Sequence, residues 1–313
     1  MTHSDAECPH ILVVSAATPE LVPRLAQRFI VHEAAPENDG SDVSAPIAGS
    51  VRGLVTTSKA GATGRLIGTL PRLEMISVSG GHIHMIDQKA VESRGIKVAS
   101  TPGISTPDVA DLAISHLLSV ARGIAASDRY LRAGRWATDG HMGLATQVSG
   151  KRLGIVGLGA IGSIVARRAQ AFDLEVHYFG PRRKADVGYC YHDDLVEMAA
   201  AVDFLVVTCV ANAETRHIVD EDVLAALGPA GFLINVTFGT ADTSALIKAL
   251  QTGAIAGAGI DVYDDAPNVP QEFLEMENVV LTSHIGSATR ETRGRMAEQT
   301  IAALCQHFGL SMP

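Results

Sequence analysis

The sequence predicts an α/β protein built from two doubly wound parallel sheets. Short apolar runs typical of buried strands alternate with helical patterns along the chain. The chain has 313 residues, enough for about two domains. A glycine fingerprint at residues 157–162 begins near mid-chain, so about 150 residues precede it and must form a second unit.

The first hundred residues predict a small α/β unit that ends near Thr101-Pro102-Gly103. Residues 34–50 are rich in Ala, Pro, Gly, Ser and Asp and predict a loop. A long helical pattern then runs from Thr106 to Ala133, with Thr106 as N-cap and Pro107 in the first turn. The predicted strands are Ile11–Ser15, Gly53–Thr57, Met75–Val78 and Ile96–Ala99, and the predicted helices are Pro19–Ile30 and Asp87–Arg94.

The second half of the chain continues the alternation. Strands are predicted at Leu153–Val156, Leu174–Phe179, Phe204–Val210, Gly231–Val236, Ala256–Val262 and Asn278–Thr282, and helices after the fingerprint and at Asp194–Ala200, Glu221–Leu227, Thr243–Gln251 and Thr289–Phe308. Ligands of such sheets bind at the carboxyl ends of the strands. The functional segments are therefore expected at 157–162, 179–184, 209–215, 237–241, 261–267 and 283–287.

The fingerprint predicts a dinucleotide site. Gly157 would allow the tight turn, Gly159 would let the backbone approach a pyrophosphate, and Gly162 would let the helix pack on the strand. Ala160 and Ile161 would open the helix, where free N–H groups and the helix dipole favour negative charge. The alternative is an ordinary strand-to-helix turn, but the strand, helix and second strand around it favour nucleotide binding.

Composition excludes several other classes. The net charge of −9, without a long basic cluster, argues against a nucleic-acid partner, and no apolar run reaches the length of a membrane span. Cys8, Cys190, Cys209 and Cys305 are scattered without CxxC spacing, so reduced thiols are expected and neither a disulfide frame nor a metal site. The polar start of the chain does not look like a signal peptide. These features predict a cytoplasmic protein.

The end of the second strand of the nucleotide unit bears on cofactor choice. NAD-selective sites usually place a carboxylate there, but Phe179-Gly180-Pro181 contains none. Arg182, Arg183 and Lys184 follow at once and would pair with a 2′-phosphate. This pattern favours NADP(H). A solvated basic turn, with NAD as cofactor, is the alternative.

Long segments of the chain resemble the D-2-hydroxyacid dehydrogenases, and particularly their NADP-dependent glyoxylate/hydroxypyruvate reductase branch. The matching segments are TPDVADLAISHLLSVARGI, YLRAGRW, the 150–184 stretch, ETRHIVDEDVLAALGPAGFLINV, AGAGIDVY and ENVVLTSHIGSATRETRGRM. The resemblance implies a Rossmann cofactor domain at 104–286, inserted into a flavodoxin-like substrate domain of residues 1–103 and 287–313, with the active site between them. It also implies a homodimer in which Trp136 reaches the partner's site. A buried structural Trp is the alternative.

The family uses three side chains for catalysis. A His donates a proton to the carbonyl as hydride arrives, a Glu keeps the pKa of that His high, and an Arg binds the substrate carboxylate. The resemblance places the His at His284 and the residue near the nicotinamide carboxamide at Asp261. Further cofactor contacts are expected at Thr106, Cys209, Val236, Thr237 and Gly286.

The other two catalytic positions depart from the family pattern. Phe238 stands at the Arg position and Ala266 at the Glu position. In an extended segment alternate side chains share a face, so Asp264 is a better replacement for the Glu than Asp265.

The substrate loop departs from the family as well. It reads Ser79-Gly80-Gly81-His82-Ile83-His84, with His82 at the family's glycine position and His84 at its acid position. Gly80 and Gly81 could form a backbone nest for an anion. His82 and His84 could supply charge or hydrogen bonds, or be ordinary loop histidines.

Two hypotheses follow. The first is an NADP(H)-dependent oxidoreductase that reduces a carbonyl other than a standard 2-keto acid, with His284 as acid/base and Gly80, Gly81, His82, Phe238 and Trp136 near the substrate. The second is a catalytically impaired nucleotide-binding sensor or interaction protein. Retention of His284 and of the cofactor motifs favours the first.

Overall fold

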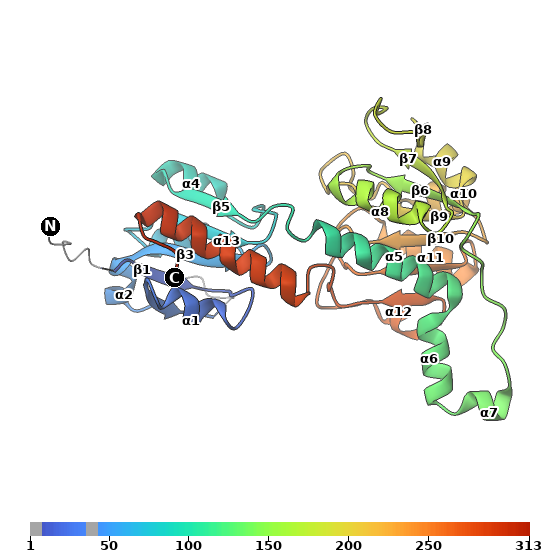
Figure 1. Cartoon of the computed structure of the whole chain (residues 1–313), viewed down its shortest axis with the longest axis horizontal. Coiled ribbons are helices and arrows are strands. Elements are labelled where there is room, and N and C mark those ends of the chain that lie inside the picture. Colours follow the sequence, from blue (N-terminus) through green and yellow to red (C-terminus); the bar gives the residue numbers. More distant parts are fainter. Residues whose placement is uncertain (1–7, 36–42) are drawn as a thin grey trace. The chain divides into compact units, whose positions relative to one another are not determined.

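Residues 8–35 and 43–313 are described by the computed structural model of the chain (Figure 1). The chain divides into two compact units, one of residues 1–105 with 289–313 and one of residues 106–288. Each unit has its own parallel sheet and is described by itself below.

The first unit contains a five-stranded sheet in its described part, with strand order β2-β1-β3-β4-β5. All neighbouring strands are parallel, so each connection crosses over the sheet. This is the strand order of flavodoxin-like domains, which confirms the predicted fold class. The strands are β1 His10–Val13, β2 Ile30–Glu33, β3 Val51–Thr57, β4 Met75–Ser79 and β5 Lys97–Ser100.

Helices pack on both faces of this sheet. They are α1 Leu21–Leu25, α2 Ala45–Ser50, α3 Gly64–Thr69, α4 Gln88–Arg94 and α13 Arg290–Phe308. The last helix comes from the C-terminal end of the chain and packs against β4. Buried hydrogen bonds fix its register, because Ser79 Oγ lies 2.8 Å from Thr300 Oγ1 and Ser77 Oγ donates to the Thr300 carbonyl.

The second unit contains a seven-stranded parallel sheet with order β12-β11-β10-β9-β6-β7-β8. From β6 the chain adds β7 and β8 on one side, and then β9 to β12 on the other side. The direction of strand order therefore reverses between β6 and β9, as in a Rossmann fold. The strands are β6 Arg152–Val156, β7 Glu175–Phe179, β8 Cys190–His192, β9 Phe204–Val207, β10 Phe232–Asn235, β11 Gly257–Ile260 and β12 Val279–Leu281.

Alternate residues of these strands bury into two cores, one on each face of the sheet. Leu205 and Leu233 belong to one core, and their neighbours Val206 and Ile234 belong to the other. The helices that cover these faces and lead away from them are α5 Thr106–Arg122, α6 Ile124–Arg132, α7 Arg135–Asp139, α8 Ala160–Gln170, α9 Leu195–Ala201, α10 Glu221–Leu227, α11 Thr243–Thr252 and α12 Gln271–Glu275.

Several helix starts confirm the predicted ones to within a residue. Asp194, Asp220 and Asp242 are N-caps whose carboxylates accept a backbone N–H three residues later. The Asp87 carboxylate caps α4 in the same way, and the Thr289 hydroxyl caps α13 by accepting from the Thr292 N–H.

Other expectations were wrong. The single helix predicted over 106–133 is two helices, since Gly123 adopts a left-handed conformation (φ 61°) and the axes bend by 61° there. Thr106 lies inside α5 instead of capping it. The helix predicted at Pro19–Ile30 is only the short α1, with Ile30 in β2.

The predicted loop at 34–50 is partly helical, because α2 covers residues 45–50; residues 36–42 lie outside the described part. The short elements β2, β8, α3, α7 and α12 were not predicted.

In the part of the chain that the structure describes, no unbroken helix combines the length and apolarity needed to cross a bilayer. The bent pair α5 and α6 meets those two criteria when taken together.

Candidate active site

The glycine turn after β6 has the geometry expected of a phosphate cradle. Gly157 has a φ of 93°, and a Cβ there would lie 2.6 Å from Cys209 Cα, so only glycine fits. A Cβ on Gly162 would collide with the Gly157 carbonyl oxygen. At Gly159, the N-cap of α8, a Cβ would meet nothing within 4 Å. The first and third glycines therefore serve close packing, and the second leaves open space at the start of the helix.

The end of β9 forms the other wall of this turn. Thr208 Oγ1 donates to the Gly157 carbonyl at 2.7 Å. Cys209 follows it, half-buried beside Gly157, and burial raises the pKa of its thiol to about 11. Cys209 is thus a neutral thiol at physiological pH.

The basic segment after β7 is open to solvent. Arg182 and Arg183 are exposed, and Lys184 is half-buried. Its backbone is anchored, because the Lys184 N–H donates to the buried Tyr178 hydroxyl at 2.7 Å. Within the described part of residues 106–288, the three side chains form no ion pair with a carboxylate.

The loop after β10 presents Phe238 to solvent. Asn235 Oδ1 accepts from the Thr237 N–H at 3.1 Å, and Thr237 Oγ1 donates to the Val207 carbonyl at 3.2 Å. Val236 is buried. Phe238 follows with half of its surface exposed (50 %), before Gly239 with a φ of 69°. An exposed phenyl ring at the sheet's carboxyl edge is available for contact with a ligand.

Asp261 anchors the segment that carries His284. Its carboxylate, 2 % exposed, follows β11 and accepts from Thr282 Oγ1 (2.6 Å) and from two backbone N–H groups, those of Ile285 (2.8 Å) and Gly286 (3.0 Å). The predicted role of Asp261 and Gly286 as cofactor contacts stays a prediction. Their mutual hydrogen bond shows a structural role that the sequence did not reveal.

A buried histidine of α5 extends this network. His116 Nε2 lies 2.9 Å from Thr282 Oγ1. Since Thr282 donates its proton to Asp261, its oxygen accepts from His116, which sets the Nε2–H tautomer. Burial lowers the pKa of His116, and the charge of Asp261 offsets part of that shift. His116 and Thr282 were missed at the sequence level, where His116 looks like any residue on the apolar face of a helix.

His284 is exposed in an uncommon backbone conformation, with a φ of 56°. Within the described residues of 106–288, no group hydrogen bonds its imidazole. The backbone that follows is held by Asp261 on both of its next two N–H groups. The ring is therefore presented outward from a fixed loop.

The carboxylates proposed to replace the family Glu are engaged elsewhere. Asp264 Oδ2 accepts from Thr243 Oγ1 at 2.9 Å, and Asp265 Oδ2 accepts from Asn268 Nδ2 at 3.1 Å. Ala266 is half-buried against the core. Replacement of the family Glu by Asp264 stays a hypothesis, and in this structure the Asp264 carboxylate hydrogen bonds Thr243.

A cavity of about 280 Å³ lies between the loop after β10 and the segment after β11. Its lining includes Gly239, Thr243, Asp264, Asp265 and Phe273. Gly239, next to Phe238, and Asp265, next to Ala266, both border it, so the two positions predicted to depart from the family pattern lie on neighbouring loops.

The first unit places the 80–84 loop after β4. Gly80 is buried and its N–H donates to Thr101 Oγ1 at 2.8 Å, while the His82 N–H donates to Ser58 Oγ at 3.2 Å. Of the two N–H groups of the expected anion nest, that of Gly80 is thus already used, and anion binding by Gly81 stays a prediction. The His82 and His84 rings are exposed, with centroids 6.0 Å apart.

Trp136 lies in α7, on an arm that α6 and α7 form away from the body of the second unit (Figure 1). Its side chain is 51 % exposed, so the buried structural Trp was the wrong alternative. Ile124, Leu131, Met142 and Leu144 are exposed on the same segment. Such a run of exposed apolar side chains is typical of an association surface.

Fold and site together define a class. A Rossmann sheet with a phosphate cradle at its switch point, and a histidine on the same edge, is typical of a nicotinamide-dependent dehydrogenase. Residues 114–286 match the family model described as D-isomer specific 2-hydroxyacid dehydrogenase, NAD binding domain. The chain belongs to this family.

Relatives agree with the assignment. The chain is 41 % identical over 299 residues to a hydroxyphenylpyruvate reductase of Plectranthus scutellarioides, which covers 95 % of each chain. It is 44 % identical over 260 residues to glyoxylate/hydroxypyruvate reductase A of Arabidopsis thaliana, 83 % of each. The structure of the NADPH-dependent glyoxylate/hydroxypyruvate reductase of Sinorhizobium meliloti, in complex with NADP and malonate, is 36 % identical with a TM-score of 0.88, over 96 % of this chain and 94 % of that one.

Proposed function

We propose that this chain is an NADP(H)-dependent reductase of a carbonyl compound that is not a standard 2-keto acid, with His284 as the proton donor. The observation that carries the proposal is Phe238, a half-exposed phenyl ring at the position where the family resemblance expects a carboxylate-binding Arg. The sensor hypothesis gains no support, since the relatives described above are named as reductases.

The two units take different roles in this proposal. Residues 104–286 hold the nucleotide, with the pyrophosphate at Gly157, Gly159, Ala160, Ile161 and Gly162, and further contacts at Thr106, Cys209, Val236, Thr237, Asp261 and Gly286. The open space at Gly159 fits a phosphate, because a side chain there would fill it. Residues 1–103 and 287–313 bind the substrate through Gly81 and His82, with Gly80 as support. When bound, NADPH supplies the hydride.

Cofactor preference rests on the basic segment after β7. Arg182 and Arg183 are exposed without a carboxylate partner in the described part of their unit, so their charge is available to a 2′-phosphate. The Sinorhizobium meliloti relative was solved with NADP. NAD remains the weaker ligand in this proposal.

The proposed substrate class follows from Phe238 at the position where the family has its Arg. An Arg fork that makes two charge-assisted hydrogen bonds, each worth about 1.5–3 kcal/mol, would stabilise a carboxylated substrate by about 3–6 kcal/mol. Phe238 makes none of these bonds and favours an apolar or aromatic group next to the carbonyl. We therefore expect ketones or aldehydes with such a group to be reduced faster than glyoxylate.

A carbonyl panel tests the proposal. The purified chain is mixed with NADPH and a set of aldehydes, ketones and 2-keto acids, and loss of NADPH absorbance is followed. Turnover of an uncharged aromatic carbonyl above that of glyoxylate is expected. Faster turnover of glyoxylate than of any other member would refute the proposed substrate class, and no turnover at all would refute the reductase.

A variant with both family side chains restored gives the converse test. Phe238→Arg with Ala266→Glu should raise glyoxylate reduction by about 10²–10⁴-fold, the rate equivalent of about 3–6 kcal/mol. Phe238→Leu with Ala266→Gln, which changes the same positions without adding charge, is the matched control. Equal gains in both variants would contradict the role assigned to the missing charges.

Assembly and location complete the proposal. The arm of α6 and α7 exposes Trp136 and other apolar side chains, which supports a homodimer joined through this arm, with Trp136 at the partner's site. The four cysteines are free thiols in the structure, which fits a reducing cytoplasm.

A further inference from the structure

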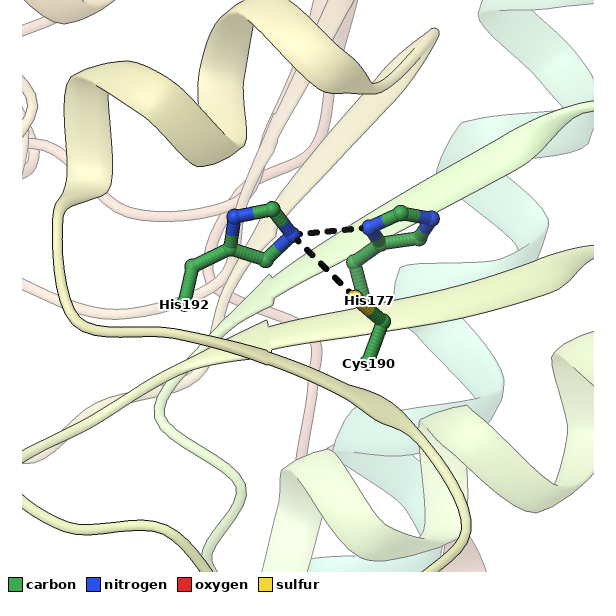
Figure 2. A group of neighbouring side chains, drawn as sticks. All are labelled: His177, Cys190 and His192. Atoms are coloured by element: carbon green, nitrogen blue, oxygen red, sulfur yellow. Dashed lines mark hydrogen bonds between the residues drawn. The ribbon is translucent and has the colours of Figure 1, made fainter.

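Three side chains of metal-ligating types meet at the outer edge of the second sheet (Figure 2). His177 lies in β7, and Cys190 and His192 lie in the edge strand β8. In the parallel register His177 pairs with Cys190, and His192 lies two pairs further along, opposite Phe179. One ligand atom from each side chain lies within 4.8 Å of the others.

The spacing is close to that of a tetrahedral metal site. His177 Nδ1 and His192 Nε2 are 2.9 Å apart, and Cys190 Sγ lies 3.7 Å from His192 Nε2. Metal–nitrogen bonds of about 2.0–2.1 Å and a metal–sulfur bond of about 2.3 Å give tetrahedral separations of about 3.3 Å for N···N and 3.6 Å for S···N. The separation of the sulfur from His192 Nε2 already matches, and the two ring nitrogens need to separate by only about 0.4 Å.

The surroundings of His177 resemble the outer shell of a metal site. His177 is buried, and its second nitrogen, Nε2, has no hydrogen bond within the described structure. The nearest carboxylate, Glu175, has Oε1 at 3.4 Å from that nitrogen, in ion-pair range. A metal-binding His commonly presents its other ring nitrogen to a carboxylate, which fixes the ring and raises its basicity as a ligand.

The first unit provides an internal comparison without a thiol. His10 in β1 and His32 in β2 repeat the stacked arrangement, with ring nitrogens 2.9 Å apart and the same offset in register. The residue paired with His10 is Ile30, where the second unit has Cys190. The His177–His192 pair therefore differs from the His10–His32 pair in having Cys190 beside it, which gives three ligands in place of two.

We propose that His177, Cys190 and His192 bind a Zn²⁺ ion at the edge of the second sheet, with Glu175 as a positioning residue. One thiolate and two imidazoles suit Zn²⁺, and a water would complete the tetrahedron on the exposed side of Cys190. The thiol proton is released when the metal binds. The ion would tie β8 to β7 and so fix the ends of the connection that carries Arg182–Lys184.

The sequence alone predicts no such site, because Cys190 belongs to no CxxC motif and His177 precedes it by a whole connection. Strand pairing brings the three residues together. The site is independent of the proposed reductase activity and is tested without it.

Metal binding is measured first on the whole chain. After chelator treatment and dialysis, Zn²⁺ affinity is determined by competition with a chromophoric chelator, and Co²⁺ is used as an absorbing probe. One site per chain, with a thiolate-to-cobalt charge-transfer band, is expected. Cys190→Ser should abolish the band, and Glu175→Gln should weaken Zn²⁺ binding by about 10–100-fold.

Two controls make the result specific. His32→Gln, which alters the matched pair without a thiol, should leave affinity and band unchanged. In the wild type, Zn²⁺ should protect Cys190 from alkylation but not Cys8, which is also exposed; mass spectrometry of the wild type reads this out without any variant. Equal alkylation of Cys190 with and without Zn²⁺, or an unchanged cobalt band in Cys190→Ser, would overturn the proposal.

Discussion

Asp261→Asn should release the segment that presents His284. The native carboxylate accepts three hydrogen bonds, one from the Thr282 hydroxyl and two from backbone N–H groups. In the variant the amide oxygen can still accept from the Thr282 hydroxyl and the Ile285 N–H, but these hydrogen bonds are then to a neutral group. The amide nitrogen, itself a donor, faces the Gly286 N–H, which loses its acceptor. Weakening two charge-assisted bonds costs about 1 kcal/mol each, and leaving one buried donor unpaired costs about 1–3 kcal/mol more.

The total loss of about 3–5 kcal/mol should appear as local opening. Backbone amide exchange of Ile285 and Gly286, followed by mass spectrometry on peptides that cover 283–288, should accelerate by about 10²-fold or more. Activity on whichever carbonyl the panel identifies should fall by about 10²-fold, since misplacing a catalytic group by about 1 Å has that effect.

Asp203→Asn is the matched control. The Asp203 carboxylate also accepts a hydrogen bond from a backbone N–H, that of Arg152 at 2.8 Å, and forms an ion pair with Lys151. Asp203 precedes β9, however, and so lies at the amino edge of the sheet. It should lose stability without fast exchange at 283–288 and without a specific loss of activity. If the two variants exchange equally at these amides, the positioning role of Asp261 is refuted.

Three further predictions follow from the same unit. Arg182→Ala should bring the affinity for NADPH close to that for NADH, and equal affinities in the wild type would contradict the cofactor assignment. Burial lowers the pKa of His116, so its contribution to stability is complete above about pH 6.5 and is lost as the pH falls toward the folded pKa. The free energy of unfolding, measured by denaturation between pH 7.5 and pH 5, should therefore fall more steeply for the wild type than for His116→Gln. Parallel pH dependences of the two free energies would argue against a neutral buried His116. Gly157→Ala should weaken NADPH binding at least about 10-fold, because its Cβ meets the Cys209 backbone at a positive φ. Gly188→Ala, whose Cβ meets nothing, should leave binding unchanged.

The central strands of both sheets were predictable because they are buried on both faces and therefore read as apolar runs, as Phe204–Val207 does. The helix starts were predictable where a side chain satisfies a free N–H, as Asp220 does. Edge strand β2 was not, because its burial is partial and Ile30 is 42 % exposed. In the sequence Gly123 cannot be distinguished from a glycine inside a helix, but in the structure its left-handed conformation ends α5.

Prediction of the site divided along similar lines. The local motif predicted the close packing at Gly157 and Gly162, because the three glycines follow one another in the chain, while phosphate binding at Gly159 stays a prediction. Contacts between distant segments could not be predicted. Nothing in the sequence near Thr282 indicates that its hydroxyl links His116 to Asp261. Likewise, nothing near Gly80 indicates that its N–H donates a hydrogen bond to the Thr101 hydroxyl.

These long-range contacts bear on the proposed role of His284 as the proton donor. A carboxylate beside the imidazole would both orient the ring and raise its pKa. In this chain no carboxylate of the described second unit hydrogen bonds His284, but Asp261 fixes the backbone on its carboxyl side. The Asp261 carboxylate therefore holds the segment that carries the ring through the main chain, without a direct contact with the imidazole.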